Sequence, residues 1–422
     1  MSFSFNAALS GLNASSNALN VVGNNIANAN TIGFRSGQAT FMDVFANHSG
    51  ARLNGAGNSI QIGDGVQIGA VHTNLAEGNL VESTSPLHAA IQGNGFFIVK
   101  NGDGSSAYTR AGDFTVDNKG FLISSTGGQV QGFAAVDGKI PAGATISSLQ
   151  LPLGKTLAPK VTTEGSLRMN LNSGAATASD FHATMQVYDS LGGQHNLDMT
   201  FTKQADGSFK MSAKLDGHDA QADVDGGGAA ATPVDFTFDS NGNLTAPATS
   251  LAIVPDQTQL GTATLPSINI NLFEKNADGT QGDANFTSFA KASAVSTTKQ
   301  DGYAAGDLNG AAVDQDGNIY GIFSNGQSRI VGQYALASFN SAEGLGRSGG
   351  NMMSETTASG QATIGAANTG GRGSIAGGYL EQSNVNITNE FVDLIEAQRG
   401  FQANSRVITS LNQTFQDLLQ IV

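Results

Sequence analysis

The chain has no cysteine and no tryptophan among its 422 residues. The lack of thiols excludes disulfides, zinc–thiolate sites and cysteine nucleophiles, and it suits a protein that crosses a membrane unfolded. No lysine or arginine precedes Arg35, so we expect no ordinary secretion signal and an export route without a cleaved signal peptide. No apolar run approaches the roughly 18 residues of a bilayer span, which predicts no membrane insertion.

Charge and proline are also scarce. Charged residues make up 13% of the chain, and 34 acidic against 20 basic side chains give a formal charge of −14. This balance argues against a phosphate-binding surface and against nucleic acid as a partner. With 8 prolines and 55 glycines, the chain has many tight turns, and its 39% of hydrophobic residues is enough for packed cores in two or three domains.

The chemistry-bearing residues form no recognisable site. The histidines are scattered without metal-ligand spacing and no nucleophile elbow is present, so we expect no catalytic, cofactor-binding or metal residues and no enzyme. Asp314, Asp316 and Asn318 have the spacing of calcium ligands, but Asn325 stands where a glutamate is needed, which favours a hairpin turn. Residues 344–349 match a dinucleotide fingerprint by letters, yet no βαβ pattern surrounds them, and we predict a flexible loop.

What the sequence does contain is an apolar heptad stripe at each end. Such stripes predict coiled-coil-like helices at 1–32 and 379–422, in which asparagine dominates the polar face of the first. That helix is marginal alone, and we expect it to order only on a neighbouring subunit. Ser383, Asn384 or Asn389 could cap the second helix. The predicted assembly interface comprises Phe5, Leu12, Leu19, Val22, Ile26, Ile387, Phe391, Leu394, Phe401, Ile408, Leu411, Phe415 and Leu418.

The middle of the chain repeats one small unit. Residues 116–122, 238–244 and 313–319 share the spacing apolar, Asp, two variable residues, Gly, any residue, apolar. The aspartate supplies a side-chain acceptor for the turn and the glycine a positive φ, so each unit predicts a β-hairpin. The body of the chain is therefore predicted to be mainly antiparallel β.

Several motifs resemble those of the bacterial flagellar rod and hook proteins, the axial protein family. Residues 8–14 and 22–34 resemble the family's N-terminal signature, and 380–386 with 390–399 resemble its closing signature. Residues 93–99 and 108–114 are similar to its inner β domain. The length and the inserted middle fit the hook branch rather than the shorter rod proteins. The N-terminal motif residues are Asn24, Asn25, Ile26, Ala27, Asn28, Gly33 and Phe34.

The resemblance implies a mainly β, discontinuous, multidomain fold. Terminal helices at 1–32 and 379–422 would pair in an inner-tube domain, with a connecting segment at 33–70 and 361–378. An inner β domain would comprise 71–150 and 296–360, and an inserted outer β domain 151–295. The glycine-rich stretch 50–65 is either a movable strut between subunits or a surface loop.

The resemblance also implies a function. A hook subunit polymerises with itself into a curved, flexible tube, a universal joint that transmits motor torque and encloses the export channel, in the extracellular part of the flagellum. Implied partners are the distal rod protein, the hook cap protein, the hook–filament junction protein and the flagellar type III export apparatus. Two alternatives stay open: a straight distal rod subunit, and more remotely an exported β-rich adhesin or carbohydrate-active protein.

Overall fold

The computed structural model describes residues 2–45, 63–224, 233–248, 250–275 and 281–421. It is mainly β with one helix near each terminus, which confirms the predicted fold class. Two compact units divide the chain: unit 1 is Met1–Leu153, Gly310–Ile322 and Ser328–Val422, and unit 2 is Gly154–Asn309 and Phe323–Gln327.

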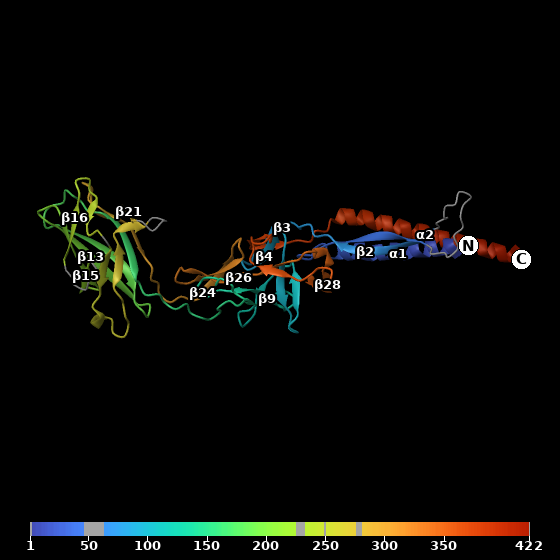
Figure 1. Cartoon of the computed structure of the whole chain (residues 1–422), viewed down its shortest axis with the longest axis horizontal. Coiled ribbons are helices and arrows are strands. Elements are labelled where there is room, and N and C mark those ends of the chain that lie inside the picture. The colour runs from blue at the N-terminus through green and yellow to red at the C-terminus, as the bar shows by residue number, and fades with distance from the viewer. Residues whose placement is uncertain (1, 46–62, 225–232, 249, 276–280, 422) are drawn as a thin grey trace. The chain divides into compact units, whose positions relative to one another are not determined.

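The two helices of unit 1 lie side by side and run antiparallel (Figure 1). They are α1 (Ser2–Ala27) and α2 (Ile387–Ile421). Asn25 near the end of α1 bonds Glu390 in the first turn of α2, whereas Gly11 lies against Asn404 farther along α2. Asn386, rather than one of the three expected residues, caps α2, because its Oδ1 accepts from the amides of Thr388 (3.1 Å) and Asn389 (3.3 Å).

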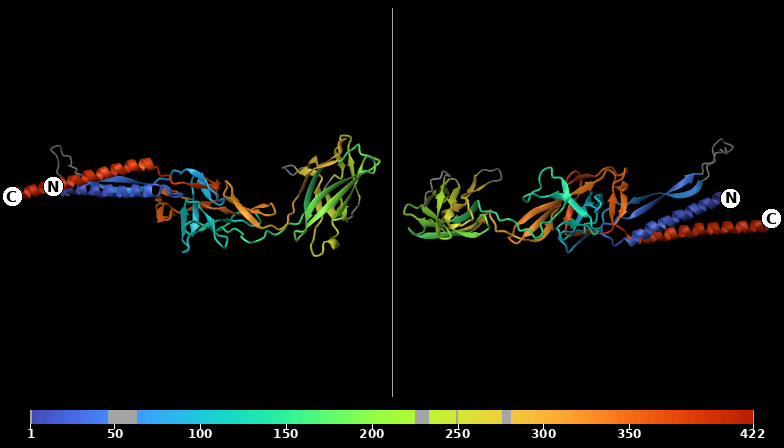
Figure 2. Two further views of the ribbon diagram at one scale, coloured as in Figure 1. Left: turned by 180° about the vertical axis from the view of Figure 1, so that it is seen from behind. Right: turned by 90° about the horizontal axis from the view of Figure 1, so that it is seen from below.

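A long β-hairpin lies along α1, as the views of Figure 2 also show. It consists of β1 (Gly37–Phe45) and β2 (Gly63–Thr73), paired antiparallel. Its tight contact with the helix is at Gly65, where an added Cβ would lie 1.9 Å from Ser10 Oγ, and Ser10 Oγ accepts a bond from the Val66 amide (3.1 Å). The stretch 50–65 was predicted to be a strut or a surface loop. Residues 50–62 lie outside the described residues, and residues 63–65 are the first three of β2.

The β body of unit 1 is one large antiparallel sheet with two short strand pairs beside it. The main path is β24-β25-β26-β9-β5-β6-β29-β28, and β7, β8, β10, β27 and β30 join it from the side. Its strands are β5 (Phe96–Lys100), β6 (Ser106–Thr109), β7 (Thr115–Val116), β8 (Leu122–Ile123), β9 (Gln129–Ala134), β10 (Ile146–Ser148), β24 (Leu308–Val313), β25 (Asn318–Phe323), β26 (Ser328–Tyr334), β27 (Leu336–Ser338), β28 (Gly346–Gly349), β29 (Met352–Ser354) and β30 (Thr363–Gly365). The two pairs are β3 (Leu80–Glu82) with β32 (Tyr379–Glu381), and β4 (Ala89–Gln92) with β31 (Ser374–Gly377).

An aromatic cluster forms the centre of this sheet's core. The ring of Phe97 packs edge-on against Phe114 (5.0 Å between centroids) and Tyr334 (5.6 Å). All three side chains are fully buried, and the Tyr334 hydroxyl donates to the Leu87 carbonyl at 3.0 Å. Buried aromatic pairs of this geometry add to the free energy of burial, so the cluster holds the sheet rigid.

Unit 2 is a second antiparallel-dominated sheet that curls around its own core. The path is β12-β13-β14-β15-β18-β19-β11-β22, with β16, β17 and β23 at its sides. Its strands are β11 (Glu164–Asn170), β12 (Asp180–Tyr188), β13 (Gln194–Lys203), β14 (Phe209–Leu215), β15 (His218–Asp223), β16 (Val234–Phe238), β17 (Leu244–Ala246), β18 (Leu251–Val254), β19 (Ile268–Asn271), β22 (Phe286–Thr287) and β23 (Ala294–Gln300), with a separate hairpin of β20 (Phe273–Lys275) and β21 (Gln281–Ala284). The short helices are η1 (Gln257–Gln259) here and η2 (Ala342–Gly344) in unit 1.

The repeated aspartate–glycine units form the predicted hairpin turns. Asp314 Oδ1 accepts bonds from the amides of Asp316 (2.9 Å) and Asn318 (2.8 Å), and Gly317 has φ +78°. The turns at 117–121 and 239–243 have the same bonds and a glycine of positive φ. The carboxylate that resembled a calcium ligand therefore organises backbone amides.

The prediction of a flexible loop at 344–349 was wrong. Residues 346–349 form β28, which pairs antiparallel with β29. The glycines there permit a bulged strand, with Gly349 at φ +87°. The side chain of Arg347 in this strand places its guanidinium over the ring of Phe34, 5.6 Å from the ring centroid, and donates a hydrogen bond to the Arg35 carbonyl at 2.8 Å.

Candidate assembly interface

The seam between α1 and α2 is built from small side chains. Three of the six buried residues among those described in α1 are alanines, with Ala8, Ala14 and Ala18 between 4% and 9% exposed. A Cβ added to Gly11 would lie 2.7 Å from Asn404 Nδ2, and one added to Gly400 would lie 3.2 Å from Ser15 Oγ. The two backbones therefore approach closely, with little volume available for large apolar side chains.

The predicted interface residues divide into two groups. Val22 is buried, and eight residues are half-buried: Phe5, Leu12, Leu19, Ile26, Leu394, Phe401, Ile408 and Leu411. Ile387, Phe391 and Phe415 are exposed, and the side chain of Leu418 lies outside those described. The structure adds four exposed apolar residues of α2 that the heptads missed, namely Val392, Ile395, Val407 and Leu419.

Helix α1 packs against elements of its own chain, whereas the sequence predicted that it would fold only when packed against a neighbouring subunit. Its contacts are with α2 and with the β1–β2 hairpin. Even so, none of the described side chains of α2 is buried. A helix of 35 residues in which no described side chain is fully buried leaves much of its apolar stripe uncovered by its own chain.

Asn25 joins three elements at the base of the helices. Its side-chain amide donates to the Gly37 carbonyl (2.8 Å) and to Glu390 (3.1 Å), and its Oδ1 accepts from the Gly37 amide (2.9 Å). Asn25 is 2% exposed, and its side-chain amide pairs with the carbonyl and the amide of Gly37 as a neighbouring strand would. Burial and the nearby charge of Asp393 raise the pKa of Glu390, while the bond from Asn25 opposes that rise.

The other N-terminal motif residues end α1 and fix the turn after it. Asn28 Nδ2 bonds Asn24 across the last turn, and Ala27 is the final helical residue. Gly33 has φ +67°, its amide donates to the Glu381 carbonyl (2.8 Å), and a Cβ there would lie 2.5 Å from the Ala111 amide nitrogen. Only glycine fits that position, because a side chain would meet both a strained φ and the neighbouring backbone.

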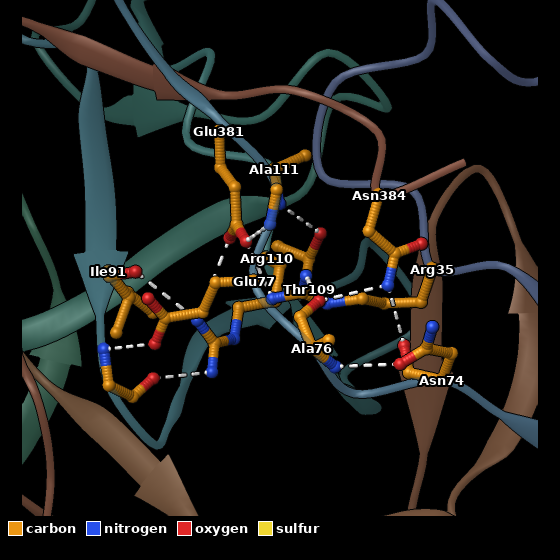
Figure 3. Close-up of polar contacts among 12 residues, drawn as sticks. Arg35, Asn74, Ala76, Glu77, Ile91, Thr109, Arg110, Ala111, Glu381 and Asn384 are labelled. Carbon is orange, nitrogen blue, oxygen red and sulfur yellow. Dashed lines mark hydrogen bonds and ion pairs between the residues drawn. The ribbon is translucent and has the colours of Figure 1, made fainter. Parts of the chain in front are cut away.

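A buried charged cluster ties both ends of the chain to the β body (Figure 3). Glu381, whose side chain is 0% exposed, lies 2.7 Å from Arg35 NH2 and 3.6 Å from Arg110 NH1. Its Oε1 also accepts from the Gly78 amide at 2.9 Å. Burial and the charge of Arg35 lower the pKa of Arg110 to about 10, against the opposing effect of Glu381.

Backbone carbonyls complete the cluster. Arg35 donates to the Ala76 carbonyl, and Arg110 NH2 donates to the Gly93 carbonyl at 2.6 Å. Asn384 donates to Ala76 as well (2.9 Å), as Figure 3 shows. The bonds of Arg35 and Arg110 are charge-assisted and stronger than neutral ones, whereas the neutral amide of Asn384 holds the path from β32 into α2.

Sequence reasoning did not identify this charged cluster. No spacing relates residues 35, 110 and 381, and each lies in a different motif. One signal was present, because the motif at 108–114 places an arginine next to a strand in a chain with few charges. A charged residue in such a position is buried only when it is paired.

The described residues offer little for other functions. Neither described helix combines the length and the hydropathy that a bilayer span requires. Within the described ranges, no group of histidine and carboxylate side chains has the geometry of a metal site. The prominent feature of unit 1 is thus a surface of exposed apolar residues along a helix.

Comparison with known families matches four parts of the chain. Residues 5–35 match the profile described as "Flagella basal body rod protein", and 376–421 match "Flagellar basal body rod FlgEFG protein C-terminal". Residues 90–167 match "Flagellar hook protein FlgE/F/G D1 domain", and 160–303 match "Flagellar basal body protein FlaE D2 domain".

Relatives align over nearly the whole chain. The flagellar hook protein FlgE of Escherichia coli is 32% identical over 99% of both chains, and that of Treponema pallidum is 33% identical over 98% of both. The crystal structure of Helicobacter pylori FlgE2, 15% identical, superposes with a TM-score of 0.50 over 72% of this chain and all of that one, which supports the fold. The chain belongs to the flagellar hook protein family.

Proposed function

We propose that the chain polymerises through its terminal helices into the wall of the flagellar hook, outside the cell. The observation that carries this proposal is α2, a helix of 35 residues with exposed Phe391, Ile395 and Val407 and no fully buried described side chain. A solitary chain gains little from such a helix. Neighbouring copies that cover the exposed side chains would contribute about 1.5–3 kcal/mol for each large apolar residue buried.

The tube has to bend as it rotates, so some contacts must hold while others exchange. Apolar contacts along α1 and α2 would hold the wall. The β surfaces would exchange partners, because their exposed residues are mostly polar; all but one residue of β23 are exposed, with serine, threonines and a lysine among them. Wet polar contacts are replaced at small net cost.

The domain roles follow the same logic. Helices α1 and α2 would line the export channel, the sheet of unit 1 would surround them in the assembled tube, and unit 2, which includes residues 154–309, would supply its outer layer. The role is structural rather than catalytic. The distal rod protein, the hook cap protein, the hook–filament junction protein and the flagellar export apparatus are the partners that such a subunit meets.

Electron microscopy of polymer grown from the purified chain tests this function. A hook subunit gives curved tubes, whereas a distal rod subunit would give straight, stiff ones. Glycan binding by a chain that never forms tubes would instead favour an adhesin. Leu19→Asp and Leu394→Asp should weaken tubes, although both residues are half-buried within the single chain, so the fold of each variant has to be checked by circular dichroism.

A further inference from the structure

A groove of unit 1 lies between α2 and the β1–β2 hairpin, and it holds about 570 Å³. Its apolar lining includes Val21 and Val22 of α1, Phe41 of β1 and three alanines, at positions 18, 39 and 397. Phe41 is 54% exposed although it is a large aromatic residue on a strand. The groove therefore presents apolar surface that nothing in its own chain covers fully.

The α2 side of this groove is acidic. Glu390, Asp393 and Glu396 all line it. Carboxylates three residues apart on one helix repel each other, which costs a few tenths of a kcal/mol per pair. Among the residues that the structure describes, no basic side chain forms an ion pair with Asp393 or Glu396. The acidic side of the groove is thus complementary to a cationic, partly apolar surface.

The same helix carries such a surface on another side. Residues two apart on an α-helix differ by about 200° in direction, so Phe391 and Ile395 point away from Asp393. They are 51% and 47% exposed. Arg399 follows Ile395 by four residues and Arg406 by eleven, which continues the same side, and both are exposed. None of these four residues lines the groove.

We propose that this basic side of α2, made of Phe391, Ile395, Arg399 and Arg406, docks into the acidic groove of a second copy of the chain. Phe391 and Ile395 would cover the apolar lining, and the arginines would face the carboxylates. The inference rests on the proposed function and names the surfaces through which it works.

The two surfaces differ, so the contact is heterologous. Each docked copy leaves one free groove at one end of the assembly and one free basic side at the other. Such a contact adds copies without limit instead of closing into a dimer, provided that the rotation between copies does not form a ring. This is the connectivity that an open helical tube needs.

Charge reversal tests the pairing of the two surfaces. Asp393→Arg reverses one of the three groove charges and Arg406→Glu reverses one of the two charges of the basic side. The two positions are about 20 Å apart along the helix, so they cannot pair within it. Each variant alone should need at least about tenfold more protein to polymerise, because like charges then meet. The concentration of protein at which polymer first appears is measured by sedimenting polymer over a series of protein concentrations.

An equimolar mixture of the two variants should regain polymer. The groove of the Asp393→Arg chain attracts the substituted side of the Arg406→Glu chain, and the natural side of the first chain still fits the natural groove of the second. A chain with both substitutions should regain it too. The control, Asp219→Arg, makes the same charge change at an 89% exposed side chain of unit 2 and should leave assembly unchanged. Circular dichroism confirms that every variant is folded.

The outcomes separate this inference from the proposed function. Single variants that polymerise like the natural chain, or a mixture and a double variant that both stay unassembled, would overturn the docking. In those cases polymer from the unchanged chain would still support the hook subunit. An unchanged chain that forms no tube under any condition would instead refute the proposed function.

Discussion

Unit 2 and the helical pair of unit 1 bury their residues in opposite ways. The core of unit 2 contains large side chains at 0–2% exposure, among them Phe201, Phe236 and Phe286 in mutual ring contact. The described part of the α1–α2 pair buries three alanines, Val22 and Asn25 of α1 and no side chain of α2. Unit 2 therefore has a large apolar core of its own, whereas α2 keeps its apolar stripe partly exposed within the single chain.

The difference shows which stability belongs to the monomer and which to the polymer. A substitution in the unit 2 core should affect folding first. One on the outer side of α2 should leave folding intact and affect assembly.

The largest loss of folding stability is expected from Phe236→Ala. The ring is fully buried and lies 5.5 Å from Phe201 and 5.4 Å from Phe286 between centroids. Removing it should cost unit 2 about 3–5 kcal/mol, measured by urea unfolding. Phe289→Ala, at a ring that is 49% exposed, is the matched control and should cost far less. Equal losses would mean that the core is not where the structure places it.

A loss of about 3 kcal/mol is expected from Glu381→Gln in unit 1. The change leaves Arg35 and Arg110 buried without their common counter-ion, and breaking a buried ion pair on one side is strongly destabilising. Hydrogen exchange at residues 76–82 should speed up accordingly. Glu82→Gln, at an exposed residue of β3, should leave exchange unchanged. Unaltered protection in Glu381→Gln would contradict the role of the charged cluster.

Ile395→Asp should change monomer stability by less than about 0.5 kcal/mol, because the side chain is 47% exposed and contributes little to the monomer. Polymer should nevertheless disappear at concentrations where the natural chain assembles. Leu191→Asp, at a 66% exposed residue of unit 2, is the control and should polymerise normally. Tubes from Ile395→Asp would remove the distinction between the two regions.

The smallest effect is expected at His195 of unit 2, which lies between Asp189 (3.1 Å) and Asp216 (2.6 Å). Burial alone would lower its pKa, but the bonds to Asp216 and Asp189 outweigh burial and raise the pKa above 6.5. Its contribution is therefore complete below about pH 6.5 and is lost as pH rises through the folded-state pKa.

We expect unit 2 to lose a few tenths to about 1 kcal/mol between pH 6 and pH 9 in urea unfolding. His195→Gln should abolish this dependence. His182→Gln, at an exposed histidine that bonds only Thr200 among described residues, should retain it. A slope of opposite sign would show that burial, rather than the aspartates, dominates the pKa of His195.

Local chemistry predicted the turns well and the helix ends poorly. The hairpin at 314–318 follows from one aspartate and one glycine, whose bonds lie within five residues. Asp189 forms the same kind of turn, because its Oδ1 accepts a hydrogen bond from the Gly193 amide (2.7 Å). The sequence pattern did not identify this turn because Gln194 is polar where the pattern requires an apolar residue. The cap of α2 was missed because several asparagines precede it and only the backbone path selects Asn386.

Nonlocal features could not be predicted in this way. Arg35, Arg110 and Glu381 meet because three distant strands and turns converge on one buried point. Likewise, the heptads predicted an apolar stripe on α2 but not which residues would face α1. That choice depends on the close approach at Gly11 and Gly400, a property of the packed pair.

By itself, the sequence determined the elements: two helices with apolar stripes, aspartate–glycine hairpins between them, and the signatures of the family. These depend on periodicity and on contacts within a few residues, so they can be read along the chain. Only the tertiary structure decided that Glu381 holds both ends together and that Phe391 and Ile395 remain outside the α1–α2 seam. Both outcomes depend on which surfaces are already covered, and coverage is a property of the folded chain.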